Sequence, residues 1–149
     1  RLKGITPRQG AMLEDRYRLP QPRCALGVRL PGIATASADV SDGLLADAGH
    51  VADASGLAVV VEREAIPLSA AARTALTVES KLWAAVLGGG DDYELVLAVP
   101  RRKRAALRAA ADASGIDVTR IGHFTDGAGV QLMIDGRAAP LPRKGYVHF

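Results

Sequence analysis

The chain has 149 residues, a length that suits one folding unit with a single continuous core. Apolar residues make up 48% and charged residues 23%, which is the balance of a globular protein rather than of a disordered chain. The net charge of +3 is mild and aromatic residues contribute only 4%, so we expect no nucleic-acid surface, which would usually combine a basic stripe with stacking rings.

The apolar runs are of strand length, and the run at 57–61 falls far short of the roughly 20 residues that span a bilayer. The first residues, Arg1-Leu2-Lys3-Gly4, lack the apolar core of a signal peptide. We therefore expect a cytoplasmic protein without membrane contact. The single cysteine, Cys24, has no partner for an internal disulfide and no metal-ligand spacing, so we interpret it as a packing or surface residue.

Two regions are expected, a connector at 1–30 that enters from a domain upstream and an organised domain at 31–149. The chain does not begin with Met, and its first part is irregular and contains several prolines. A short helix is predicted from Gln9 to Leu19, because Pro20 and Pro22 would end it. We expect a fragment or a processed chain.

Hydrophobic periodicity in the second region predicts the order β-α-β-α-β-α-β-β. Helices are expected to end at glycines, such as Gly56 after the first and Gly115 after the third. The predicted fold class is an α/β layered domain with helices packed on one face of a sheet. The predicted strands are 33–38, 57–61, 93–99, 118–124 and 130–134, and the predicted helices are 44–55, 79–87 and 101–114.

A cluster of two carboxylates and a hydroxyl, Asp39, Ser41 and Asp42, lies between a predicted strand and a predicted helix. Mg²⁺ prefers hard oxygen ligands, usually one or two carboxylates together with water and phosphate oxygens. The residues could also be ordinary turn residues, with Ser41 or Asp42 as the N-cap of the helix. The spacing alone does not decide between these readings.

A second cluster, Gly88-Gly89-Gly90-Asp91-Asp92-Tyr93-Glu94, follows the next predicted helix. Glycines let a backbone approach a ligand closely, but acids follow them here instead of the Lys and Ser/Thr of a Walker A loop. Such a loop would suit a metal or a cationic ligand, or it is simply a helix end that leads into an acidic turn. His50, His123 and His148 show no ligand pattern, and the basic run Arg101–Arg104 is interpreted as a solvated face.

Taken together, four blocks closely resemble the thiamine-monophosphate kinase family, in its order and spacing, from about Arg16 to the end of the chain. Two blocks contain the acidic clusters, one is Ile66-Pro67-Leu68-Ser69, and the last is Lys144-Gly145-Tyr146-Val147-His148-Phe149. The resemblance implies a mixed sheet with helices on one face, as in the C-terminal domain of the aminoimidazole-ribonucleotide-synthetase-like superfamily. The aspartate motif alone is shared across that superfamily.

The resemblance also implies an activity, the transfer of the γ-phosphoryl group of ATP to thiamine monophosphate, which gives thiamine diphosphate. By this resemblance Asp39 and Asp42 would bind Mg²⁺, Ser41 would contact ATP, and Asp91 and Tyr146 would contact the thiamine substrate. No residue of the chain is assigned a covalent or acid-base role, because phosphoryl transfer depends mainly on charge neutralisation and positioning.

Two departures from the family qualify these expectations. Val147 stands where the family usually has aspartate, so the substrate end departs from the family pattern at this position. The family's amino-terminal half is absent, and with it other metal-binding aspartates and the strands through which a homodimer would form. We therefore expect the chain alone to be inactive. The alternatives are a related ATP-using enzyme of the superfamily and a non-catalytic ligand-binding module.

Overall fold

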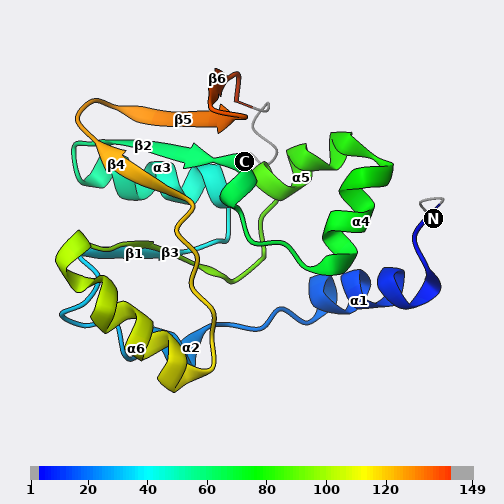
Figure 1. Ribbon diagram of the computed structural model, residues 1–149, viewed down its shortest axis with the longest axis horizontal. Helices are drawn as coiled ribbons and strands as arrows, with labels where there is room; N and C mark the ends of the chain where they lie inside the picture. The colour runs from blue at the N-terminus through cyan, green and yellow to red at the C-terminus, as the bar shows by residue number, and fades with distance from the viewer. Residues whose placement is uncertain (1–3, 142–149) are drawn as a thin grey trace.

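The computed structural model describes residues 4–141 and contains two separate sheets (Figure 1). Strands β1 (Ala36–Asp39) and β3 (Leu95–Ala98) form an antiparallel pair. In the larger sheet β2 pairs in parallel with β5, and the other neighbouring strands are antiparallel, so this sheet is mixed as expected. Its strands, in spatial order, are β4 (Gly122–Thr125), β2 (Ala58–Glu62), β5 (Gly129–Ile134) and β6 (Arg137–Ala139).

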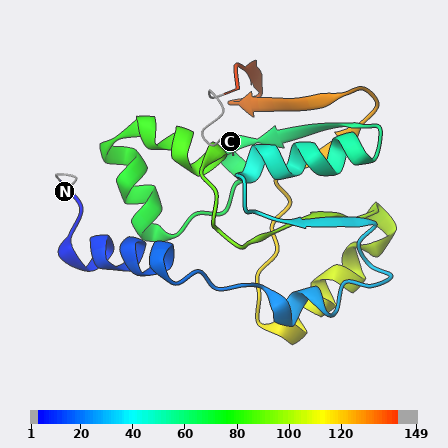
Figure 2. The ribbon, with the colours of Figure 1, turned by 180° about the vertical axis from the view of Figure 1, so that it is seen from behind.

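Helix α3 (Leu44–Ala54) lies between the two sheets, as both ribbon views show (Figures 1 and 2). Its buried Ala48 and Ala52 pack in the main core cluster with Val61 and Leu132 of the larger sheet and with Val96 of β3. Small alanine side chains let both sheets approach the helix closely, and burial of branched side chains drives the association. The expected α/β fold, with a helix on one face of a mixed sheet, is confirmed.

A second core cluster lies on the other side of the β1–β3 pair. There Leu26 and Leu30 pack with Ala110 of α6 (Arg104–Ser114), and Leu95 and Leu97 of β3 cover them. Successive strand residues point to opposite faces, so β3 serves both clusters, with Val96 in one and its neighbours in the other.

The amino-terminal part is more regular than expected. Helix α1 (Pro7–Arg18) begins with a capping box between Thr6 and Gln9, and a short α2 (Cys24–Gly27) follows. Because Leu26 and Leu30 are buried, the last residues of the expected connector pack as part of the domain. Cys24 is exposed, which agrees with its interpretation as a surface residue.

Several element boundaries differ from the prediction. Helix α4 (Ala70–Val78), capped by the hydroxyl of Ser69, was not predicted, and neither was strand β6. The helix expected at 79–87 is instead a 3₁₀ turn, η2 (Ser80–Leu82), followed by α5 (Trp83–Gly88). The strand expected from residue 118 begins only at Gly122. Two further 3₁₀ turns are η1 (Arg63–Ala65) and η3 (Arg101–Lys103).

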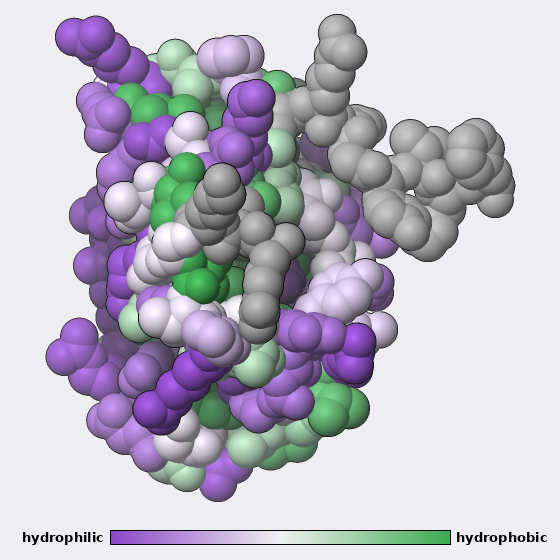
Figure 3. All heavy atoms as spheres, turned by 90° about the vertical axis from the view of Figure 1, so that its right-hand side faces the viewer, coloured by the Kyte–Doolittle hydropathy of each residue, from purple (hydrophilic) through white to green (hydrophobic). Residues whose placement is uncertain are grey.

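The two predicted glycine helix ends are confirmed. Gly56 and Gly115 follow α3 and α6 with φ angles of 64° and 65°, a left-handed conformation that glycine adopts without steric cost. Within residues 4–141, no helix has both the length and the apolar content needed to cross a bilayer. On the side of the molecule that Figure 3 presents, hydrophilic residues cover much of the surface and hydrophobic residues gather in small groups.

Candidate functional site

The two acidic segments lie side by side because of the pairing of β1 and β3. In this antiparallel pair Asp39, the last residue of β1, is opposite Leu95, the first residue of β3. The chain leaving β1 and the chain entering β3 therefore meet at one end of the pair. We call them the 39–43 turn and the 88–94 loop.

Backbone hydrogen bonds join the turn to the loop. The N–H of Asp91 donates to the carbonyl of Ser41 at 3.0 Å, and the N–H groups of Asp92 and Tyr93 donate to the carbonyl of Val40 at 3.1 and 3.0 Å. The N–H of Val40 donates in return to the carbonyl of Glu94 at 2.8 Å. Acids 52 positions apart in sequence, Asp39 and Asp91, are thus held on adjoining segments.

The glycines serve this contact. A Cβ atom on Gly90 would lie 2.0 Å from the carbonyl oxygen of Ser41, and one on Gly43 would lie 2.8 Å from the carbonyl carbon of Gly88. Gly43 also has a φ of 120°, outside the range of other residues. The sequence suggested that the glycine run lets the backbone approach a ligand; in the structure it lets the loop approach the turn.

The positive φ values of the loop fall on non-glycine residues. Asp91 has a φ of 63° and Tyr93 a φ of 54°. Such angles are uncommon for residues with a Cβ, and for a bulky aromatic residue they are strained. The hydrogen bonds to the turn hold both residues in this conformation, and both side chains are exposed.

The expected N-cap at Ser41 or Asp42 is wrong. The N-cap of α3 is Gly43, which has no side chain to cap the helix, and the Asp47 carboxylate in the first turn of the helix bonds instead to the residues that precede the helix. Its Oδ2 accepts hydrogen bonds from the backbone N–H groups of Ser41 and Asp42 at 3.0 Å and of Gly43 at 3.1 Å. A short carboxylate inside the helix can reach all three N–H groups because the turn folds back over it.

The donor chemistry of the site fits Mg²⁺. Asp39 and Asp91 are exposed carboxylates, and Asp42 lies on the same turn as Asp39. Side-chain atoms of Asp42, Asp47 and His50 also lie within 4.8 Å of one another, with Nδ1 of His50 at 3.6 Å from Oδ1 of Asp47. Carboxylate oxygens are the ligands that Mg²⁺ takes from proteins.

Electrostatics in the loop follows from its crowded acids. Partial burial raises the pKa of Asp92, and the neighbouring charges of Glu94 and Asp91 raise it further. Arg23 offsets part of this negative charge, because its guanidinium donates two hydrogen bonds to the Glu94 carboxylate, the Nε bond measuring 2.7 Å. The same hydrogen bonds raise the pKa of Arg23. This bidentate contact links the end of the loop to the start of α2.

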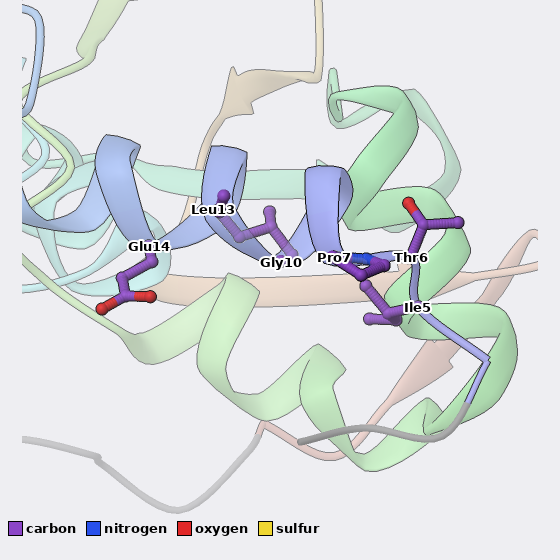
Figure 4. A pocket seen from close by; sticks show the side chains of 7 residues that line it. Ile5, Thr6, Pro7, Gly10, Leu13 and Glu14 are labelled. Atoms are coloured by element: carbon purple, nitrogen blue, oxygen red, sulfur yellow. The ribbon is translucent and has the colours of Figure 1, made fainter.

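A separate hollow lies on α1, away from these acids (Figure 4). It measures about 350 Å³ and is lined only by residues of α1 and the segment before it, from Ile5 to Glu14. It contains no residue of the 39–43 turn or the 88–94 loop, so it is not part of the candidate site.

Most of the residues singled out from the sequence fall within this arrangement. Asp39, Ser41, Asp42 and Asp91 lie on the two joined segments, whereas Tyr146, Val147 and His148 lie outside the described residues. Sequence reasoning missed Asp47. The available signal was an acidic residue in the first turn of a helix, a favourable position for negative charge.

Comparison with known families agrees with the fold. Residues 11–135 match the family model described as AIR synthase related protein, C-terminal domain, and the chain belongs to this family. Comparison with individual proteins gives a narrower match than the family model does. The chain is 45% identical over 144 residues to a thiamine-monophosphate kinase of Caulobacter vibrioides, covering 93% of this chain and 40% of that protein.

Solved structures of thiamine-monophosphate kinases are also similar to this chain. The crystal structure of thiamine-monophosphate kinase from Stenotrophomonas maltophilia K279a is similar, with a TM-score of 0.79, 41% identity and coverage of 93% of this chain and 43% of that one. AaThiL complexed with AMPPCP and TMP is similar with a TM-score of 0.73 and 29% identity, and the match covers 97% of this chain and 44% of that one. The chain thus spans less than half the length of the relatives it matches.

Proposed function

We propose that this chain is the C-terminal domain of an enzyme that phosphorylates thiamine monophosphate to thiamine diphosphate with ATP. The proposal is supported by the backbone hydrogen bonds between the 39–43 turn and the 88–94 loop, which hold the segment of Asp39 and Asp42 beside the segment of Asp91. The relatives are thiamine-monophosphate kinases, and the AaThiL complex contains AMPPCP, an ATP analogue.

In this proposal Asp39 and Asp42 hold Mg²⁺, Ser41 contacts ATP, and Asp91 contacts the thiamine substrate, as does Tyr146 near the end of the chain. Bound Mg²⁺ would supply charge neutralisation between the two anionic reactants. The chain's own residues bind and orient: the hydrogen bonds across the turn and the loop fix the distance between the Ser41 and Asp91 segments. Fixed relative positions lower the entropy cost of bringing donor and acceptor into line.

Three parts of the proposal concern the whole protein. We propose that it works in the cytoplasm, that it binds neither nucleic acid nor membrane, and that it forms a homodimer through a region outside this chain. The chain alone would turn over negligibly and bind Mg·ATP weakly, because it matches less than half of the related kinases. Calorimetry that shows tight Mg·ATP binding by residues 1–149 would contradict this point.

The test uses the full-length protein that contains this chain, incubated with thiamine monophosphate, ATP and Mg²⁺, with thiamine diphosphate measured by chromatography. Replacing Asp39 or Asp42 by Asn should lower kcat/KM by about 100-fold or more, since charge stabilisation of the transition state is lost. Asp53→Asn on the exposed side of α3 is the control and should change activity less than about twofold. If the unmodified protein makes no thiamine diphosphate, the proposal fails, and a related ATP-using enzyme or a binding module becomes the better reading.

A further inference from the structure

The side chain of Asp47 is buried, although acidic side chains usually face solvent. Among residues 4–141 it is the one buried residue with a polar or charged side chain, and it is only 4% exposed. A buried carboxylate is costly unless hydrogen bonds compensate it. Here Oδ2 accepts three backbone N–H groups at 3.0, 3.0 and 3.1 Å, all from the turn that precedes its own helix.

These contacts close a small ring between the turn and the helix. The backbone N–H of Asp47 donates to the carbonyl of Gly43 at 2.9 Å, while its carboxylate accepts from Ser41, Asp42 and Gly43. Hydrogen bonds to a charged acceptor are about twice as strong as neutral ones. The backbone conformation of the turn that carries Ser41 and Asp42 is therefore held by Asp47.

The same contacts change what the turn can bind. The N-terminus of a helix ordinarily attracts anions, because its first N–H groups and its dipole favour negative charge. At α3 an internal carboxylate already accepts from the three N–H groups before the helix. Asp39 and Asp42 add further negative charge on the same turn, so at the amides of residues 41–43 a phosphate would meet repulsion and donors that Asp47 already occupies.

We infer that Asp47 is a positioning residue that sets the 39–43 turn for a cation and withholds its amides from direct contact with phosphate. A phosphate then approaches this turn only when a divalent cation lies between them. The inference rests on the proposed function for its ligand, but it concerns a residue to which that proposal gives no role.

The first arm of the test needs no variant. In the full-length protein that contains this chain, labelled with ¹⁵N, inorganic phosphate without a divalent cation should leave the amide resonances of Ser41, Asp42 and Gly43 in place. Phosphate added together with Mg²⁺ should move them. Movement of these resonances by phosphate alone would overturn the inference, because it would show that the amides are available as donors.

The second arm uses Mn²⁺ as a probe for Mg²⁺, with the dissociation constant read from paramagnetic broadening of the same amide resonances. Asp47→Asn keeps the shape but removes the charge, and should weaken Mn²⁺ binding by about tenfold or more, the usual effect of losing a group that orients metal ligands. Asp53→Asn removes one charge from the exposed side of the same helix and should weaken it by less than about twofold.

A purely structural role for Asp47 would give a different pattern, in which Asp47→Asn lowers the melting temperature but binds Mn²⁺ as tightly as Asp53→Asn does. That result would overturn the inference. If the unmodified full-length protein that contains this chain binds no Mn²⁺ at all, the proposed metal site fails, whereas the titration with phosphate alone still decides whether Asp47 occupies the amides of the turn. The same titration decides the matter if Asp47→Asn does not fold.

Discussion

Replacing Gly90 by Ala tests the contact between the turn and the loop. The new Cβ would lie 2.0 Å from the carbonyl oxygen of Ser41, whereas real Cβ atoms essentially never approach other atoms closer than 3.0 Å. The two segments must therefore separate by about 1 Å. The hydrogen bond from the Asp91 N–H to Ser41, now 3.0 Å long, would stretch to about 4 Å, beyond hydrogen-bonding distance.

The cost follows from the bonds that share this contact. Separation also strains the two hydrogen bonds to the carbonyl of Val40, and each lost bond costs about 0.5–1.5 kcal/mol. We expect Gly90→Ala to lower the free energy of unfolding by about 2–4 kcal/mol in total. In a chain of this size that corresponds to a fall in melting temperature of roughly 4–16 °C.

Thermal unfolding followed by far-UV circular dichroism measures the change. Gly88→Ala is the matched control, since a Cβ there would meet nothing within 4 Å and the residue ends α5, where alanine is tolerated. It should shift the melting temperature by less than about 2 °C. If Gly90→Ala melts with Gly88→Ala, the two segments are not in the contact described, and the candidate site loses its basis.

Two further predictions concern the charges of the 88–94 loop. The raised pKa of Asp92 means that the folded state holds its proton above the ordinary value of 3.8, so Asp92 destabilises the fold increasingly as pH rises through that window. Asp92→Asn should therefore have a higher free energy of unfolding than the parent at pH 7 in EDTA. The gain should be less than about 1 kcal/mol, because solvent screens a side chain that is only partly buried. The two proteins should converge as pH falls below 3.8, and a constant difference at all pH values would contradict the cause given. For the Arg23–Glu94 pair, a double-mutant cycle with Arg23→Gln and Glu94→Gln should give a coupling of about 1 kcal/mol or less, and Arg23→Lys should lose most of it because one ammonium cannot reproduce the bidentate contact. Additive single effects in urea unfolding would show that the pair contributes nothing.

Local sequence signals predicted most of the regular elements. The ends of α3 and α6 were predicted to within a few residues. The signals were the helical spacing of Leu44, Leu45 and Ala48 and the glycines that follow both helices. These features depend on neighbours in sequence, so a single chain displays them. Helix α4 was missed although its sequence carries local signals, an N-cap at Ser69 and apolar residues at helical spacing, of which Ala71 and Ala75 are buried.

The division into two sheets lay beyond sequence reasoning. In the sequence, strands β1 and β3 look like members of one sheet with β2, yet among the strands of residues 4–141 they pair only with each other, and α3 lies between the two sheets. Which strands pair depends on how helices and strands pack in space, and the continuous apolar run of β3, which packs on both faces, fits either arrangement.

For the site, the sequence by itself determined which residue types are available: acids at Asp39, Asp42 and Asp91, a hydroxyl at Ser41, and glycines beside them. Only the tertiary structure decided that the two segments touch, because the antiparallel pairing of β1 with β3 brings together parts of the chain that no local rule relates. It also decided the role of the turn amides. They face a buried carboxylate instead of solvent, and that arrangement arises only when the turn folds back onto the first turn of α3.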